Sequence, residues 1–336
     1  MAPHTPHMLV APRRSRGAPR YRAHREGHDS APHTTSASMI RRALGRTGLE
    51  VGVLGFGGSE IGFEGTEVAT VRRLLDDALA AGLNVVDTAE CYGDSEALIG
   101  EALAGRRHDV HLFTKCGHFE GTGRDDWRPA SLERSIARSL ERLRTDHVDL
   151  LQLHTCSEED LRRGEVIEVL ERARARGQTR FVGYSGDGAA ARYAVECGSF
   201  DTLQTSINVA DQEAIELTVP AARARGVGVI AKRPIANAAW RTGRRPDNAY
   251  HHTYWERLQR LDYDVLRRPP AESIGVALRF TAAIPGVHTL IVGTTRPGRW
   301  RENAAWLDDG VMPPPEFEGL RARWRAVADA SWVGQR

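Results

Sequence analysis

Short apolar runs alternate with longer amphipathic stretches along the chain from residue 39 onward. Eight runs of four to seven residues are rich in apolar side chains; they lie at 53–56, 84–87, 110–115, 148–154, 180–185, 202–206, 227–232 and 289–292. Most are separated by stretches in which apolar residues recur about every 3.6 positions, which predicts helices at 68–81, 132–143, 166–176 and 214–224. Such alternation of strand and helix is typical of a parallel sheet covered by helices.

Eight strand–helix units in about 300 residues predict an α/β protein with a closed (β/α)8 TIM barrel. The alternative is an open, doubly wound sheet, whose G-x-G-x-x-G turn must lead at once into a helix. Gly55, Gly57 and Gly58 follow the first apolar run, but the helical pattern begins only several residues later. The barrel is therefore the favoured fold.

Two segments of the chain interrupt this regular pattern. Residues 42–51 predict an N-terminal β-hairpin with a turn near Thr47 and Gly48, which is suited to closing the bottom of the barrel. Residues 236–270 form a long loop after strand 7 of the barrel. A substrate lid and a surface helix anchored by aromatic residues both fit this loop.

Residues 1–38 differ in composition from the rest. They contain six arginines against two acidic residues and show no periodic apolar pattern, which predicts a disordered tail. No apolar stretch follows Arg13 and Arg14, so a secretory or twin-arginine signal is not expected, whereas a mitochondrial-type presequence or a dispensable extension before Met39 both fit. Residues 39–336 are expected to form a single barrel domain.

Composition narrows the class of protein. The 336 residues are 41% hydrophobic, with 46 basic against 44 acidic side chains, so nucleic acid is not expected as a partner. No apolar run approaches the ~20 residues that cross a bilayer, so no membrane-spanning helix is expected. Four cysteines do not make a disulfide framework, which favours a reducing, cytoplasmic location.

Six successive apolar runs contain a polar residue at or near the end, and two of these are the only lysines of the chain. The residues are Asp87, Lys115, His154, Ser185, Gln204 and Lys232. The carboxyl ends of barrel strands meet on one face, so these side chains are expected to converge there. An ammonium, unlike a guanidinium, can be desolvated and its pKa adjusted, which makes Lys115 and Lys232 candidates for a site.

Tyr92 follows Asp87 by five residues, in a loop short enough to reach the same face. A free phenol has a pKa near 10, too high for efficient proton transfer near neutral pH. The ammonium of Lys115, held by Asp87, is expected to lower the pKa of Tyr92, and His154 to complete a polar cradle around a substrate oxygen. Each residue alone is compatible with a structural role, but the four together predict acid–base chemistry.

The motifs around these residues resemble those of the aldo-keto reductase family over nearly all of 39–332. They read NVVDTA at 84–89, ALIG at 97–100 and DLLQLH at 149–154. The resemblance implies a catalytic tetrad of Asp87, Tyr92, Lys115 and His154, and hydride transfer from NADPH, less often NADH, to the carbonyl carbon of a small aldehyde or ketone. Tyr92 would then protonate the alkoxide. A cofactor-sensing regulatory subunit without catalysis is the alternative.

The resemblance also implies where the cofactor binds. Ser185 and Gln204 are expected to hold the nicotinamide carboxamide, while the asparagine usual in the family is Gly186 here, and Asp187 is a possible substitute. Lys232 stands where a stacking aromatic ring is usual. Lys232 and Arg233 are therefore expected to contact the pyrophosphate instead.

The segment after the last strand matches the family's adenosine site, and a loop that enters a helix N-terminus suits an anion. Arg296 and Arg299 are expected to pair with the 2′-phosphate of NADPH, and Glu302 and Asn303 to reach the adenine. Gly293, before Thr294, replaces a usual basic residue, so NADH also remains possible. The cysteines near the tetrad, Cys91, Cys116 and Cys156, match no standard zinc spacing, and no metal is expected.

Overall fold

The computed structural model describes residues 39–118, 125–308 and 310–335. The tail expected at 1–38 lies outside these residues, and the boundary placed before Met39 stays a prediction. No helix within the described ranges combines the length and the apolarity needed to cross a bilayer.

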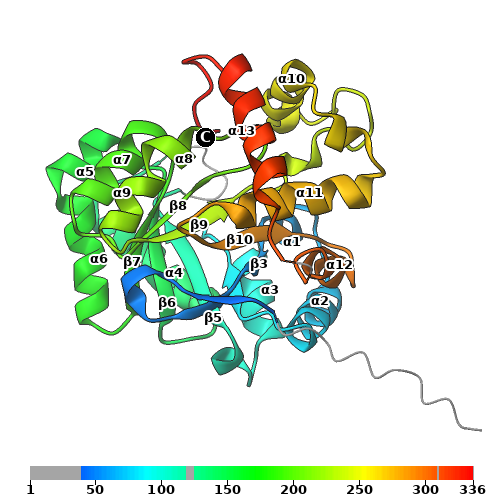
Figure 1. The fold of residues 1–336 in the computed structure, drawn as a ribbon. Coiled ribbons are helices and arrows are strands. Elements are labelled where there is room, and N and C mark those ends of the chain that lie inside the picture. The colour runs from blue at the N-terminus through cyan, green and yellow to red at the C-terminus, as the bar shows by residue number, and fades with distance from the viewer. Residues whose placement is uncertain (1–38, 119–124, 309, 336) are drawn as a thin grey trace, which may run out of the picture. The chain divides into compact units, whose positions relative to one another are not determined.

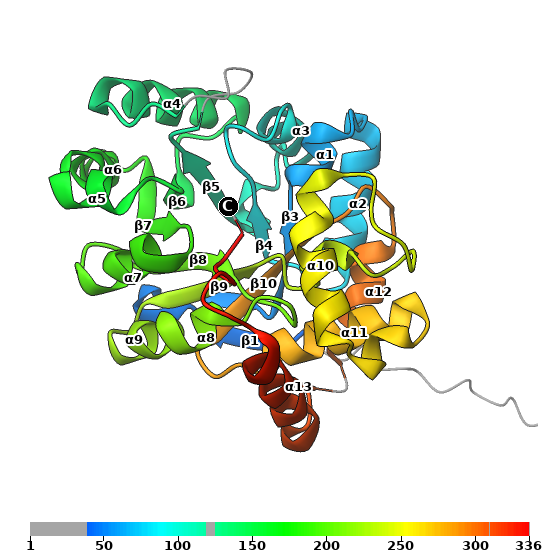
Figure 2. The same ribbon diagram turned by 90° about the horizontal axis from the view of Figure 1, so that it is seen from above.

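Eight parallel strands form a closed barrel in the order β10-β3-β4-β5-β6-β7-β8-β9 (Figures 1 and 2). They are Leu54–Gly57 (β3), Val85–Asp87 (β4), His111–Cys116 (β5), Val148–His154 (β6), Thr179–Ser185 (β7), Thr202–Ser206 (β8), Gly228–Lys232 (β9) and Val287–Gly293 (β10). Each of the eight apolar runs corresponds to one strand. The predicted (β/α)8 barrel is confirmed.

Helices surround this barrel on the outside (Figure 2). They are Ser59–Phe63 (α1), Val68–Ala80 (α2), Ser95–Ala102 (α3), Pro129–Arg142 (α4), Glu158–Arg163 (α5), Glu165–Ala175 (α6), Gly188–Glu196 (α7), Glu213–Leu217 (α8), Val219–Ala224 (α9), His252–Leu261 (α10), Pro270–Ala283 (α11), Arg299–Ala305 (α12) and Pro314–Val327 (α13). In α2, Val71, Leu74, Leu75 and Ala78 are buried, at the spacing of one helix face. This stripe attaches the helix to the barrel wall.

One predicted helix is wrong in its extent. The pattern at 214–224 predicts a single helix, but the structure has two, α8 and α9, separated at Thr218. Pro220 lacks the N–H that a continuous helix would use to bond the carbonyl of Glu216, so the helix is interrupted just before it.

The predicted hairpin is present and closes the amino-terminal end of the barrel. Strand β1 (Arg41–Ala43) pairs antiparallel with β2 (Glu50–Gly52), and Gly48 in the connection adopts a left-handed φ of 71°. Side chains of the hairpin join those of the barrel strands in one buried cluster, made of Leu44, Leu49, Val51, Val85, Phe113, Leu150, Ile230 and Ile291. The polar strand ends therefore lie at the other end of the barrel.

The long segment after β9 is ordered rather than an open loop. It contains α10 and three short 3-10 helices, Ala236–Ala238 (η3), Ala249–His251 (η4) and Asp264–Arg267 (η5). Aromatic side chains anchor it: Trp240 Nε1 donates to Ser273 Oγ at 2.9 Å, and the buried Tyr254 hydroxyl donates to Asp211 Oδ2 at 3.1 Å. An anchored helix is thus observed in 236–270, and a role of this segment as a substrate lid stays a prediction.

Candidate active site

Asp87 and Lys115 form a buried ion pair where β4 and β5 end. Lys115 Nζ donates to Asp87 Oδ2 at 2.6 Å and to the carbonyl oxygen of Thr88 at 2.8 Å. Only 2% of Lys115 and 3% of Asp87 are exposed. Burial alone lowers the pKa of Lys115, but the Asp87 carboxylate and Tyr92 outweigh it and leave the pKa above its ordinary value. The ammonium is therefore both charged and fixed in place.

Tyr92 lies directly beside this ammonium, as its position five residues after Asp87 suggests. Lys115 Nζ is 5.0 Å from the centroid of the Tyr92 ring, and the ring meets that of His154 edge-on at 5.8 Å. Burial raises the pKa of Tyr92 to about 12, although Lys115 acts to lower it. The expected net lowering of this pKa is thus wrong, because desolvation of the phenolate outweighs the nearby cation. Tyr92 is a neutral phenol, with a proton to give.

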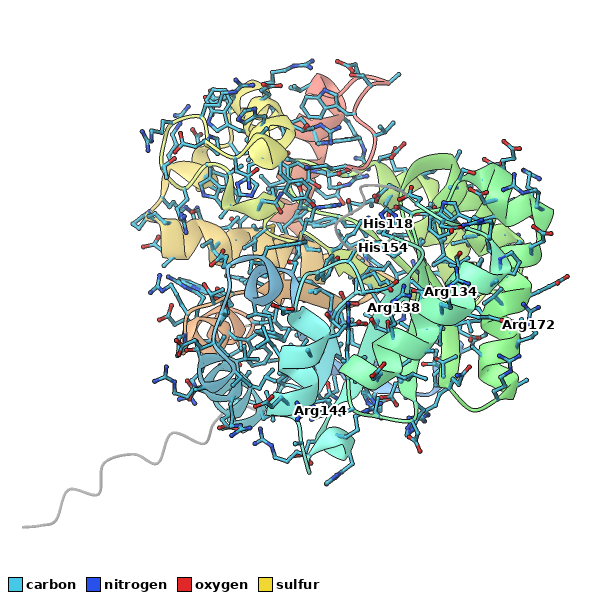
Figure 3. The ribbon with its side chains drawn as sticks, turned by 180° about the vertical axis from the view of Figure 1, so that it is seen from behind. His118, Arg134, Arg138, Arg144, His154 and Arg172 are labelled. Atoms are coloured by element: carbon cyan, nitrogen blue, oxygen red, sulfur yellow. The ribbon has the colours of Figure 1, made fainter. Side chains whose placement is uncertain are left out.

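His154 ends β6 and completes the group around Tyr92. Its Nδ1 lies 3.5 Å from the Cys91 sulfur, and its ring is 4.7 Å from that of His118 (Figure 3). Burial, followed by the charge of Lys115, lowers the pKa of His154 well below its ordinary value. A neutral imidazole carries one N–H, which suits it to donate a hydrogen bond to a carbonyl oxygen.

His118 is a further neighbour of this site and is not among the residues predicted from the sequence. Its Nε2 lies 2.7 Å from Thr155 Oγ1, and its Nδ1 lies 3.2 Å from Asp125. Thr155, directly after His154, has a φ of 64°, which is unfavourable for a β-branched residue. The one sequence feature that indicates that His118 is close to the site is its position three residues after Lys115.

Ser185, at the end of β7, has a buried hydroxyl with no hydrogen-bond partner among the described residues. It stands in register with Gln204 on β8 and with His154 on β6. The amide of Gln204 accepts from Gln152 Nε2 at 3.4 Å. A buried hydroxyl without a partner requires an explanation, and a polar ligand such as a carboxamide supplies one. These residues therefore fit the nicotinamide end of the expected cofactor.

Lys232, which is expected at the pyrophosphate, is paired with a carboxylate. Its Nζ lies 2.9 Å from Asp187 Oδ2, and Asp187 also accepts hydrogen bonds from Thr205 Oγ1 at 2.8 Å and from the Ser206 backbone N–H at 2.7 Å. Lys232 thus balances the charge of the buried Asp187 carboxylate. Asp187 in turn is held by β8 and β9, rather than standing free to replace the missing asparagine.

Arg233, at the end of β9, is engaged by residues far away in the sequence. Its Nη1 donates to Ser206 Oγ at 2.7 Å and to the carbonyl oxygen of Gln335 at 2.8 Å, and its Nε donates to the Tyr250 hydroxyl at 2.6 Å. The C-terminal tail that supplies Gln335 runs across the strand ends (Figure 2). The sequence after residue 327 does not predict that the tail docks at this position, because the residues that bind the tail lie elsewhere in the chain.

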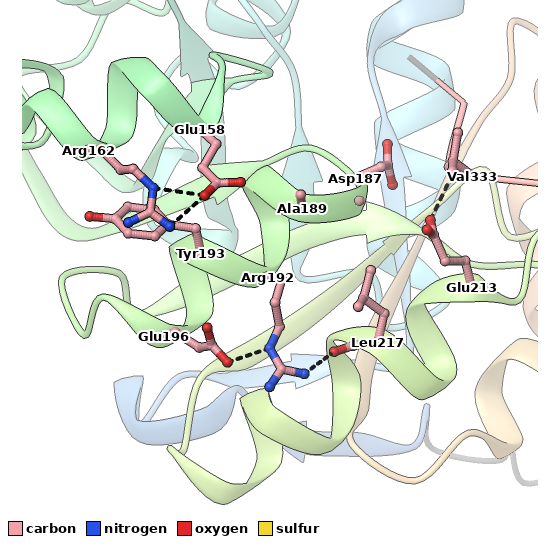
Figure 4. A pocket seen from close by; sticks show the side chains of 12 residues that line it. Glu158, Arg162, Asp187, Ala189, Arg192, Tyr193, Glu196, Glu213, Leu217 and Val333 are labelled. Atoms are coloured by element: carbon pink, nitrogen blue, oxygen red, sulfur yellow. Dashed lines mark hydrogen bonds and ion pairs between the residues drawn. The ribbon is translucent and has the colours of Figure 1, made fainter. Parts of the chain in front are cut away.

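A pocket of about 530 Å³ lies beside this tail, between α5, α7 and α8 (Figure 4). Charged side chains such as Arg162 and Arg192 line it, together with Val333 of the tail. It shares Asp187 with the strand-end cluster, but Tyr92, Lys115 and His154 are not among its lining residues. The acid–base group therefore lies outside this pocket.

The segment after β10 holds the residues expected at the adenosine end. Arg299 Nη1 lies 2.9 Å from Glu302 Oε2, Asn303 is buried, and Thr294 Oγ1 accepts from the Arg296 backbone N–H at 3.1 Å. Two acidic residues that were not predicted as site residues, Glu60 and Glu64, also lie here. A side-chain carbon on Gly293 would overlap Oε2 of Glu60, and Thr295 Oγ1 donates to Glu64 Oε2 at 2.9 Å.

Comparison with known proteins gives the family. Residues 53–323 match the sequence model of the Aldo/keto reductase family. The chain belongs to this family. It is 28% identical over 300 residues to the uncharacterized oxidoreductase YqkF of Bacillus subtilis, covering 84% of this chain and 96% of YqkF.

Two further relatives support this assignment. L-galactose dehydrogenase of Arabidopsis thaliana is 35% identical over 58% of this aldo-keto reductase and 65% of the plant protein. The solved structure of aldo-keto reductase AKR11C1 from Bacillus halodurans, in its holo form, superposes with a TM-score of 0.75 at 27% identity, covering 88% of this chain and 99% of that one. The chain is thus an oxidoreductase of the aldo-keto reductase family, whose members use nicotinamide cofactors.

Proposed function

We propose that this chain reduces an aldehyde or a ketone to an alcohol, by hydride transfer from a nicotinamide cofactor with Tyr92 as the proton donor. One observation carries the proposal: the Lys115 ammonium, fixed by Asp87 at 2.6 Å, lies 5.0 Å from the ring centroid of a neutral Tyr92. That arrangement favours loss of a proton from the phenol only when a strong acceptor forms beside it. An alkoxide generated from a carbonyl is such an acceptor.

Each residue of the group has a distinct task. His154, neutral at the edge of the Tyr92 ring, would donate a hydrogen bond to the carbonyl oxygen and orient it. Tyr92 would give its proton to that oxygen as negative charge develops, and Lys115 would stabilise the phenolate left behind. Asp87 keeps Lys115 charged and aimed. The bound cofactor supplies the hydride.

The residues that would hold the cofactor lie on β7 and β8 and in the segment that follows β10. Ser185 and Gln204 would bind the carboxamide, and the segment from Gly293 to Asn303 would bind the adenosine end. From Arg296 and Arg299 alone, NADPH is expected, with NADH also possible.

The substrate is a small carbonyl compound, and a cytoplasmic location stays a prediction from the cysteine content.

Turnover by the purified chain tests the proposal. We expect the purified chain to oxidise NADH or NADPH when it is given a panel of aldehydes and ketones. The reaction is monitored as the loss of the absorbance of the reduced nicotinamide. Dinucleotide binding is measured separately, by quenching of tryptophan fluorescence. Tight binding without turnover of any substrate would contradict the proposal and favour a cofactor-sensing subunit instead.

A further inference from the structure

A carboxyl group from α1 covers the end of β10. Gly293, the last residue of β10, pairs with Gly57 at the end of β3, and α1 begins two residues after β3. Oε2 of Glu60 occupies the position that a side chain on residue 293 would need, and Ser59 Oγ donates to this oxygen at 2.7 Å. A lysine or arginine at 293 would therefore require the carboxyl end of Glu60 to move from this position.

A second carboxyl group borders the same loop. Glu64, which follows α1, accepts a hydrogen bond from Thr295 Oγ1 at 2.9 Å. The contacts of Glu60 and Glu64 thus fall on alternate residues, Gly293 and Thr295, of the chain that leaves β10. This loop is bordered by acidic groups on the side that faces α1.

The arginines of this loop do not outweigh these acids. Arg299 already lies 2.9 Å from the Glu302 carboxylate, and Arg296 is exposed to solvent. Glu60, Glu64 and Glu302 thus lie near Arg296 and Arg299, while Arg301 on the same helix lies 3.6 Å from Asp77. The loop lacks the excess of positive charge that a phosphate dianion needs.

NAD(H) and NADP(H) differ in one substituent, and we expect that substituent to contact this loop. NADP(H) carries a phosphate on the 2′-oxygen of its adenosine ribose, whereas NAD(H) carries a hydroxyl. A carboxyl oxygen accepts a hydrogen bond from that hydroxyl, which is how acidic residues recognise NAD in other folds, and it repels a phosphate. In barrels of this kind, the loops after the last two strands commonly bind phosphate groups, and here they follow β9 and β10.

We propose that Glu60, with Glu64 beside it, makes this enzyme select NAD(H) over NADP(H). The inference rests on the proposed function, since it presumes a nicotinamide dinucleotide in the barrel mouth. It reverses the preference expected from Arg296 and Arg299, because the carboxyl groups of Glu60 and Glu64 lie at the same loop. Glycine at position 293 is part of the same arrangement, as it leaves the space that Glu60 fills.

Binding constants test this selection without any turnover. We expect the full chain to bind NADH at least about tenfold more tightly than NADPH, and ADP more tightly than 2′,5′-ADP, as measured by calorimetry. Glu60→Gln keeps the size of the side chain and removes its charge, so it should bring the two dinucleotides to within about threefold of each other. Glu67→Gln, an exposed glutamate just before α2, is the matched control and should keep the wild-type ratio.

Three results would overturn the inference. Equal or tighter binding of NADPH by the wild-type chain would refute it while leaving the proposed function intact. An unchanged ratio in Glu60→Gln, with an unchanged melting temperature, would remove Glu60 as the cause. Failure of the wild-type chain to bind either dinucleotide would overturn both this inference and the proposed function.

Discussion

At the scale of single residues, the site depends on buried charged groups that stabilise each other by forming an ion pair. Lys115 and Asp87 are both almost fully buried, and each balances the charge of the other. The same ammonium also faces the Tyr92 ring, so one buried pair has both a structural and a chemical role. These two roles can be separated by mutation.

Lys115→Met is expected to abolish carbonyl reduction and to lower the free energy of unfolding by about 3 kcal/mol, because Asp87 is left as a lone buried charge. Adding Asp87→Asn removes that charge, so the double variant should regain most of the stability but none of the activity. Urea unfolding and reduction assays measure the two effects. Substantial activity in the double variant would show that the ammonium is not needed for the chemistry.

Asp211 makes stability depend on pH. It is buried beside Tyr254 and Arg257, and burial raises its pKa to about 7. Between about pH 4 and 7 the folded state therefore holds a proton that the unfolded state releases, so this residue lowers stability as pH rises through that range. The stability difference between wild type and Asp211→Asn should change by more than about 1 kcal/mol between those pH values. A constant difference would contradict the raised pKa.

At the scale of elements, buried strands are the part of this fold that sequence reveals best. A barrel strand surrounded by helices appears as an unbroken apolar run, and all eight runs coincide with strands to within two residues. The convergence of Asp87, Lys115 and His154 followed from strand ends alone. Glu60 was missed, because its proximity to Gly293 depends on a contact between distant segments. His118 and Thr155 lie within three residues of Lys115 and His154, but no local pattern distinguishes them from other loop residues.

Contacts between segments that are distant in the sequence also hold the C-terminal tail. Trp332 is 5% exposed and lies over the guanidinium groups of Arg257 and Arg260, at 5.3 Å and 4.8 Å. We expect Trp332→Ala to lower the free energy of unfolding by about 2 kcal/mol. Val333→Ala, at a side chain that is 49% exposed, should change it by less than about 0.5 kcal/mol. Equal effects in urea unfolding would show that the tail is not docked through Trp332.

At the scale of the whole molecule, the barrel and its site are built from residues after position 38. The hairpin is tied to the barrel by Arg42, which donates to the carbonyl oxygens of Val287 at 2.6 Å and Ala282 at 2.9 Å. A chain that begins at Met39 is therefore expected to keep the melting temperature within about 2 °C and the reduction rate within about twofold. A much lower melting temperature, measured by circular dichroism, would give residues 1–38 a structural role.

The most direct test of the account is the single-turnover reduction rate of Tyr92→Phe. With a carbonyl substrate and bound cofactor, we predict a loss of at least about a hundredfold, because among the described residues Tyr92 is the phenol that lies beside Lys115 to protonate the alkoxide. The dissociation constant of the reduced cofactor should change by less than about threefold, and Tyr193→Phe on α7 should match the wild type. A Tyr92→Phe variant that reduces carbonyls at the wild-type rate would contradict the role of Tyr92 as proton donor.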